Sequence, residues 1–311
     1  MYASVPLRCH DARAIPGRYA YTLGQETDVI VNGQDCDLAL NLLTIADHLQ
    51  RAGWNTSAYG KVRRHLSMRA HLCPHACAKQ TLFARLSPHQ LDTALMMVRQ
   101  WDTGMTVWGS TPACRGFDRF RGFYGAVEDY FTHQAASAYD YHADNRGEDK
   151  APDPSQSDVY TTEAVTTAVQ EWVSGQIAAR PTAKTFAYVA HQAVHGPMQV
   201  PARFINSECT GLVPASHPTR LIYCGMVRAV DESVRNITDT YRKLGILDET
   251  LGVLTTDNGG HPADGGSNYP LRGQKATLYE GGVRGLAFVW GAGLGSTVTG
   301  TVQRGMMHVV E

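Results

Sequence analysis

The sequence has almost no net charge and no long apolar run. It carries 28 basic and 29 acidic residues, a formal net charge of -1, so there is no long-range attraction to nucleic acid or to anionic lipid. No apolar segment approaches the roughly 20 residues that a membrane-spanning helix needs, and residues 1–20 lack the charged, apolar and small-residue regions of a signal peptide. We therefore expect no nucleic-acid partner and no membrane span.

Cysteine is too sparse to define a framework. The seven cysteines are scattered and odd in number, which fits neither a dense set of disulfides nor a metal-binding module. His71, Cys73, His75 and Cys77 resemble a zinc cluster only superficially, because alternate residues of one short run rarely close a tetrahedron without distant partners. We do not predict a zinc site there.

What the sequence does contain is an alternation of helix and strand. Apolar residues three or four positions apart predict three helices, over 42–53, 159–179 and 222–245. Each helix is followed by an apolar, strand-like segment, at 54–61, 184–190 and 251–256. With 43% hydrophobic residues the chain can bury a large core. We therefore expect an α/β fold with a mostly parallel sheet flanked by helices.

Polar residues gather where the predicted strands end, which is where ligands bind in open α/β sheets. Asp257 and Asn258 directly follow the strand 251–256. They offer one carboxylate and one amide oxygen, which are ligands that a hard cation prefers. On spacing alone, a simple Asn-Gly-Gly turn is the more common interpretation of this segment.

Several segments together resemble the arylsulfatase family, in order and at the expected spacings, from Gly17 to the last residue. They are AHQAVHGPMQVP (190–201), TTDNGG (255–260), NYPLRGQKATLYEGGVRG (268–285) and TPACRGFDRFRGFYGAVEDYFTH (111–133). The resemblance, which is closest to arylsulfatase B-like members, implies an alkaline-phosphatase-like fold and hydrolysis of sulfate esters. It also implies a formylglycine made from a cysteine, and a divalent cation that is usually calcium.

The resemblance assigns roles to individual residues. Asp257 and Asn258 match metal ligands, and His195 matches the histidine that assists the leaving oxygen. Lys61 and Lys275 match lysines that contact the sulfate, where fixed cations stabilise the transition state.

Each role has a structural alternative. A histidine at a strand end is more often a structural residue, and a lysine is more often an exposed, solvated side chain. His191 would share the face of His195 if the strand continued, and is the weaker candidate.

The region of the modified cysteine departs from the family pattern. Family members carry Cys-x-Pro-Ser-Arg, whereas this chain has Cys9-His-Asp-Ala-Arg13, and the spacing from Cys9 to Gly17 is shorter than in the family. Either Cys9 is the formylglycine precursor, with Arg13 beside it and the formylglycine-generating enzyme as a partner, or the match is a coincidence. Asp11 would hinder recognition by that enzyme.

Other parts of the family pattern are missing. Its paired metal-binding aspartates have no counterpart before Cys9, and its smaller carboxyl-terminal subdomain has none before Glu311. We therefore expect residues 1–311 to be a single, truncated sulfatase catalytic domain with an incomplete cation shell.

Two stretches interrupt the pattern. The polar segment 143–158 is expected to be a surface loop. Removing Val62–Gln100 restores the Gly-Lys-Trp of the family, and valine codons begin with GT while a glutamine codon can end in AG, so 62–100 is either a retained intron or a surface insertion. Where the family often has a sulfate-contacting histidine, this chain has Asp102, with His65 as the nearest histidine.

The sequence predicts a sulfuric ester hydrolase acting on a sulfated small molecule or glycan, inactive in this form if Cys9 is not modified. Two alternatives stay open: a non-catalytic sulfatase-like protein that binds a sulfated ligand, and a phosphate-ester hydrolase of the alkaline-phosphatase superfamily. Sequons at Asn55 and Asn236 favour a glycoprotein, and the family favours the secretory pathway, with a lysosomal or extracellular destination.

Overall fold

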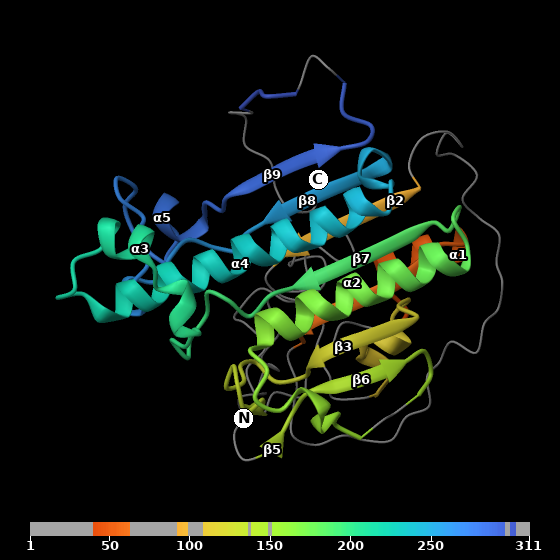
Figure 1. Ribbon diagram of the computed structural model, residues 1–311, viewed down its shortest axis with the longest axis horizontal. Coiled ribbons are helices and arrows are strands. Elements are labelled where there is room, and N and C mark those ends of the chain that lie inside the picture. The colour runs from red at the N-terminus through yellow and green to blue at the C-terminus, as the bar shows by residue number, and fades with distance from the viewer. Residues whose placement is uncertain are drawn as a thin grey trace, which may run out of the picture.

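A central sheet of seven strands organises the protein. The computed structural model describes residues 40–62, 92–98, 108–135, 138–148, 151–295 and 299–302. The strand order is β6-β3-β1-β7-β2-β8-β9 (Figure 1). The five inner strands are parallel, and the edge strands β6 and β9 run antiparallel to their neighbours. The strands span Asn55–Lys61 (β1), Thr93–Val98 (β2), Arg119–Phe123 (β3), His142–Asn145 (β6), Thr185–Ala190 (β7), Thr250–Thr255 (β8) and Ala287–Gly291 (β9).

Helices cover both faces of this sheet. The α-helices span Ile45–Arg51 (α1), Thr161–Ala179 (α2), Ser207–Leu212 (α3), Pro218–Lys243 (α4) and Glu280–Val283 (α5), and a small ribbon pairs Gln134–Ala135 (β4) with Ala138–Tyr139 (β5). The long helices α2 and α4 lie side by side over one face (Figure 1). This arrangement confirms the predicted mostly parallel α/β fold.

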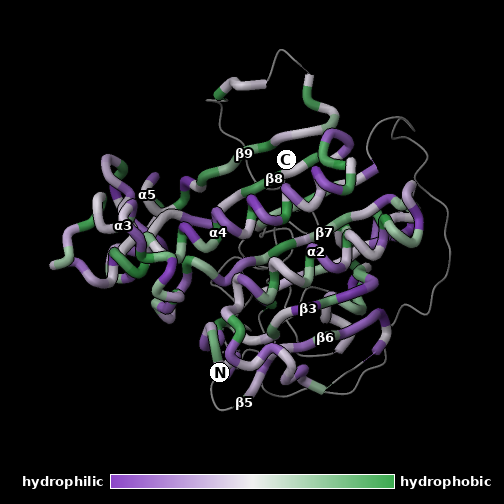
Figure 2. Tube along the Cα trace, viewed as in Figure 1, coloured by the Kyte–Doolittle hydropathy of each residue, from purple (hydrophilic) through white to green (hydrophobic). Residues whose placement is uncertain are grey.

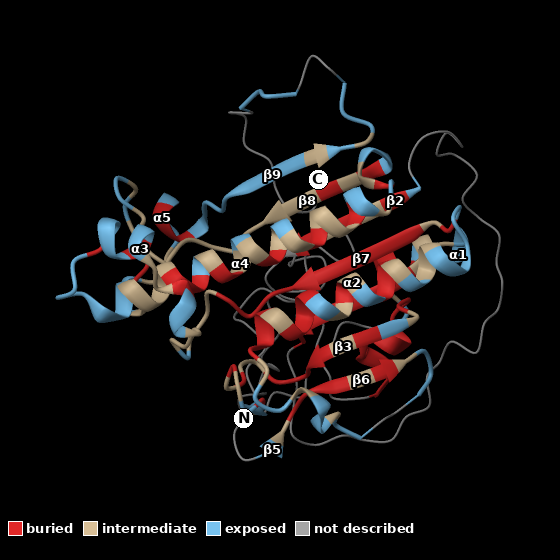
Figure 3. Ribbon diagram, in the orientation of Figure 1, coloured by how far each residue is buried: buried red, intermediate tan, exposed pale blue. Residues whose placement is uncertain are grey.

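The core lies on both sides of the central strands because side chains alternate along them. On the face under α2 and α4, Ala187 and Val189 of β7 pack with Trp172 and Ile237. On the opposite face, Phe186 of β7 packs in a second apolar cluster. Residues of α1 and of the segment after β2 also belong to this cluster. Apolar and polar residues alternate along α2 and α4 (Figure 2), and β7 is buried along its whole length while β9 is largely exposed (Figure 3).

Local signals set the helix ends. The predicted helix 42–53 begins at Ile45, because the Thr44 hydroxyl accepts from the Asp47 N–H at 3.1 Å while the Asp47 carboxylate accepts from the Thr44 N–H at 2.8 Å. The predicted helix 222–245 starts earlier, at Pro218, and ends before Gly245, whose φ of 73° suits glycine. The three predicted strands are confirmed within one residue at each end.

Part of the interrupting stretch 62–100 forms the strand β2. Thr93–Val98 pairs in parallel with β7 on one side and with β8 on the other, and Leu95 and Met97 are buried. These six residues are therefore part of the sheet, and the alternative of a surface insertion is wrong for them. The rest of the stretch after Val62 and before Asp92 lies outside the described residues, as does the cluster 71–77.

The expectation of a surface loop over 143–158 was wrong at its start. His142–Asn145 forms β6 at the sheet edge, and Asp144 is fully buried, where its carboxylate accepts a hydrogen bond from the Tyr124 hydroxyl. The polar residue Asp144 is thus used in a buried hydrogen bond and not for contact with solvent. The later residues 151–158 are mostly exposed.

One disulfide lies within the described residues, although the cysteine pattern did not predict it. Cys209 of α3 is bonded to Cys224 of α4. It anchors the short helix α3 to the first turns of the longest helix. No helix in the described part of the chain is long and apolar enough to cross a membrane.

Candidate active site

Lys61 is the last residue of β1 and is buried. Its exposed fraction is 1%, and β1 is paired on both sides, with β3 and with β7. The alternative of an exposed, solvated lysine is therefore wrong. A charged amine that is buried at the carboxyl end of a parallel strand suits the binding of an anion.

His195 lies in the loop that follows β7. Its ring atom Nδ1 is 2.9 Å from the Gly196 carbonyl oxygen, which requires Nδ1–H. The hydroxyl of the buried Tyr130 donates to the His195 carbonyl oxygen at 2.9 Å. The histidine is therefore half-buried in a loop whose backbone is anchored.

His191 does not share the face of His195, because the strand ends at Ala190. Its Nε2 is 3.1 Å from the Ser233 hydroxyl on α4, and its side chain is buried under the helices. Burial lowers the pKa of His191 to about 4. His191 is therefore a neutral structural residue at neutral pH.

Asp257 and Asn258 begin the loop after β8. Asp257 is exposed, and the Asn258 amide nitrogen donates to the Gly259 carbonyl oxygen at 2.6 Å, so the amide oxygen is not the atom engaged in that bond. A side chain at Gly259 would collide with the Gly281 carbonyl oxygen, 1.9 Å from its Cβ position. The glycine is thus required by the packing of the loop.

These two residues fit a hard cation in kind but supply only part of a shell. Calcium takes six to eight oxygen ligands, and Asp257 and Asn258 offer two side-chain oxygen donors. No group of three or more His, Cys, Asp or Glu residues that could hold a metal occurs among the described residues.

Lys275 belongs to a loop that is bonded to the Asp257 loop. Its backbone N–H donates to the Gly260 carbonyl oxygen at 3.1 Å, and its side chain is half-buried. The loops of Asp257 and Lys275 therefore form one unit. The chain between them contains no α-helix and includes Asn268.

The strand order brings these residues to one edge of the sheet. Lys61 ends β1, the loop of His195 follows β7, and the loop of Asp257 follows β8. β1 and β7 are neighbours, and β2 alone separates β7 from β8, so the strands β7 and β8 are about 10 Å apart. Cys9 and Arg13 lie outside the described residues.

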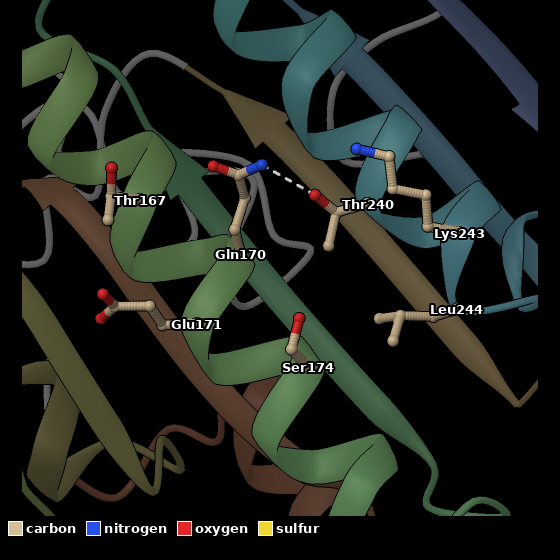
Figure 4. A pocket seen from close by; sticks show the side chains of 7 residues that line it. All are labelled: Thr167, Gln170, Glu171, Ser174, Thr240, Lys243 and Leu244. Carbon is tan, nitrogen blue, oxygen red and sulfur yellow. Dashed lines mark hydrogen bonds between the residues drawn. The ribbon is translucent and has the colours of Figure 1, made fainter.

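One cavity among the described residues lies apart from Lys61 and His195. A cavity of about 480 Å³ lies between α2 and α4, where Gln170 donates to the Thr240 hydroxyl at 2.7 Å (Figure 4). Its lining includes Lys243 at the carboxyl end of α4, which leads into the start of β8. The cavity therefore lies toward the amino ends of the strands, away from Lys61 and His195.

Sequence reasoning missed a buried contact between Glu128 and His133. The Glu128 carboxylate is 2.9 Å from His133 Nδ1 and accepts from the Thr161 hydroxyl at 2.7 Å, and neither charged side chain is exposed. Burial raises the pKa of Glu128 to about 7, and the bond to Glu128 raises the pKa of His133 despite its burial. The only sequence signal was a Glu and a His inside the family-like segment 111–133.

Comparison with known proteins shows the family of this chain. The Sulfatase family model matches residues 15–309. Mouse arylsulfatase J is 34% identical over 69% of this chain and 35% of its own length, and rat N-acetylgalactosamine-6-sulfatase is 34% identical over 35% of this chain and 20% of its own length. The chain thus spans about a third or less of the length of these curated relatives.

Solved structures share the fold. The crystal structure of Ps i-CgsB in complex with k-i-k-neocarrahexaose has a TM-score of 0.65 at 22% identity, covering 90% of this chain and 54% of that one. The structure of BT4656 in complex with its substrate D-glucosamine-2-N,6-O-disulfate has a TM-score of 0.51 at 14% identity, covering 93% and 61%. The chain belongs to the sulfatase family, and its mostly parallel sheet with flanking helices is the fold of these proteins.

Proposed function

We propose that this protein is a sulfuric ester hydrolase whose site lies at the carboxyl ends of β1, β7 and β8. The observation that carries the proposal is the burial of Lys61 at the end of β1, beside the strand that leads into the His195 loop. A buried cation and a half-buried imidazole at one sheet edge suit an anionic ester and its leaving group. Membership of the sulfatase family supports the same reaction.

In this proposal each described residue has one task. Lys61 and Lys275 bind sulfate oxygens and oppose the charge that develops on them. His195, whose Nδ1–H is committed to the Gly196 carbonyl, uses Nε2 to give a proton to the departing alcohol oxygen. This step requires a proton on Nε2.

Asp257 and Asn258 would hold a divalent cation, calcium by the chemistry of their oxygens. The cation would supply Lewis-acid polarisation of the bound sulfate. The nucleophile in this proposal comes from Cys9, after conversion to formylglycine by the formylglycine-generating enzyme, with Arg13 beside it.

The substrate class is a sulfated glycan or a smaller sulfate ester. Support comes from the ligands of two fold relatives, a neocarrahexaose and a glucosamine disulfate. A secretory location, lysosomal or extracellular, is supported by the Cys209–Cys224 disulfide, because disulfides persist in oxidising compartments. Both sequon asparagines are partly exposed, Asn55 at the start of β1 and Asn236 on α4.

Release of inorganic sulfate from nitrophenyl sulfate, with calcium present, tests the proposal. We expect turnover that His195→Ala lowers by about 10²-fold to 10⁴-fold, while the exposed His217 serves as the matched control and His217→Ala has no effect. Binding of the ester without turnover would instead favour the non-catalytic alternative, and preferential turnover of nitrophenyl phosphate would favour the phosphate-ester hydrolase.

The origin of residues 62–100 is a separate proposal, a retained intron. Sequencing the mature transcript from upstream of Met1 through the codons for residues 55–115 tests it. A transcript that omits the codons for 62–100 is the expected result. A transcript that matches the present sequence contradicts the intron and makes β2 a native strand.

A further inference from the structure

We infer that Asn268 is a positioning residue that locks the cation-binding loop to the sulfate-binding loop. The inference rests on the proposed function, because it assigns Asn268 to the residues Asp257 and Lys275 of that site. Asn268 lies ten residues beyond Asn258, and the sequence motifs assign it neither to the cation site nor to the sulfate site.

The Asn268 side chain pairs with both sides of Gly260. Its Oδ1 accepts from the Gly260 N–H at 2.7 Å, and its Nδ2 donates to the Gly260 carbonyl oxygen at 2.9 Å. An amide that meets a residue's N–H and C=O at once fixes that residue in two directions, as a neighbouring strand would. Gly260 closes the loop that begins at Asp257, so the amide fixes the end of the cation-binding loop.

The same amide also reaches the second loop. Nδ2 donates to the Gly273 carbonyl oxygen at 3.2 Å, two residues before Lys275. Lys275 returns a bond of its own, from its backbone N–H to the Gly260 carbonyl oxygen at 3.1 Å. Gly260 O thus accepts from both Asn268 and Lys275, and the two loops meet at this one carbonyl.

A third segment closes the unit from the other side. The Gly259 N–H donates to the Gly282 carbonyl oxygen at 2.9 Å, and the Gly281 N–H donates to the Arg272 carbonyl oxygen at 2.7 Å. These are backbone bonds that any side chain at position 268 would leave in place. Removal of the Asn268 amide should therefore loosen the junction without unfolding the segment.

The chemistry of the amide is specific. Alanine at position 268 loses all three bonds, whereas aspartate keeps an acceptor for the Gly260 N–H but loses both donated bonds. Asn206 provides a matched control, because its side chain accepts only from the N–H groups of Glu208 and Cys209 at the start of α3, among the described residues.

The test is calcium affinity, measured by titrating calcium chloride into the full chain, together with amide hydrogen exchange at Gly260. We expect Asn268→Ala to weaken calcium binding about tenfold and to speed exchange of the Gly260 N–H. Asn268→Asp should weaken binding less and keep the Gly260 N–H protected. Asn206→Ala should change neither quantity.

Asp257→Ala separates the cation site itself from the positioning role of Asn268. Calcium binding that Asp257→Ala abolishes but Asn268→Ala leaves unchanged overturns the positioning role and spares the cation site. Failure of the unaltered chain to bind calcium overturns the cation site of the proposed function, and the role of Asn268 with it. Equal weakening by Asn206→Ala would show a general loss of stability and would also overturn the positioning role.

Discussion

The side-chain amide of Gln192 forms two hydrogen bonds with the backbone of Glu128. Its Oε1 accepts from the Glu128 N–H at 2.9 Å, and its Nε2 donates to the Glu128 carbonyl oxygen at 2.9 Å. Both residues are buried. Because Gln192 lies three residues before His195, this pairing ties the candidate proton donor to the segment that follows β3.

Gln192→Ala should destabilise the fold and the His195 loop. The substitution leaves the buried N–H and C=O of Glu128 without these partners, and unfulfilled buried groups cost about 1–3 kcal/mol each. Urea unfolding measures the change. Gln156→Ala is the control, because the Gln156 side chain donates only to the Ser155 hydroxyl in an exposed position, and an equal loss there would contradict the role of Gln192.

Stability should fall as the pH rises toward and above 7 because of the buried Glu128–His133 pair. The folded-state pKa of Glu128 is raised from 4.5 to about 7, so its contribution is complete below pH 4.5 and is lost as the pH rises through 7. The raised pKa of His133 acts in the same direction. The groups that face Glu128 include Thr161 and Asp140.

Glu128→Gln should flatten that pH profile. The amide does not titrate, so unfolding free energies measured between pH 5 and pH 8 should differ less in this variant than in the unaltered chain. Glu171→Gln, at an exposed position on α2, should keep the original slope. An unchanged slope in Glu128→Gln would show that the pair does not govern this pH range.

His191 should act in the opposite direction at acid pH. Burial lowers its pKa from 6.5 to about 4, so its contribution to stability is lost as the pH falls from 6.5 through 4. His191→Gln should lose less stability between pH 7 and pH 4 than the unaltered chain. The exposed His217 is the control, and acid sensitivity that persists unchanged in His191→Gln would contradict the assignment.

Leu95→Ala tests whether β2 is a central strand. Leu95 is 1% exposed and packs in the core under α2 and α4. Truncating a buried leucine costs about 2–5 kcal/mol, so the urea midpoint should fall sharply. Leu212→Ala, at a leucine that is 79% exposed, should have almost no effect, and a neutral Leu95→Ala would contradict the placement of β2.

Much of the sheet was predictable, because β1, β7 and β8 each follow a helix that the apolar periodicity predicts. β7 and β8 were found within one residue. β2 was not, since its neighbours β7 and β8 come much later in the chain and no local pattern announces a pairing of that kind. β6 was missed because its residue Asp144 is polar, which favours a loop in the sequence. In the fold Asp144 is buried and bonded to the Tyr124 hydroxyl, a contact that the local sequence does not reveal.

The candidate site residues came from motifs and not from periodicity. Lys61, His195, Asp257 and Lys275 were named through the family resemblance, and the strand order brings their segments to one edge. His191 was named as the weaker candidate, and the structure bonds its ring to Ser233 of α4 instead. Asn268 and Gln192 were missed, since amides that bond backbone groups leave no sequence signature.

The affinity of the full chain for nitrophenyl sulfate, measured with calcium present, tests the central claim most directly. Lys61→Met and Lys275→Met should each weaken binding about tenfold or more, because each removes a charge-assisted bond to sulfate. Lys184→Met, at an exposed lysine paired with Asp92 before β7 begins, should bind like the unaltered chain. Equal affinity in all four proteins would contradict a sulfate site at the carboxyl ends of β1, β7 and β8.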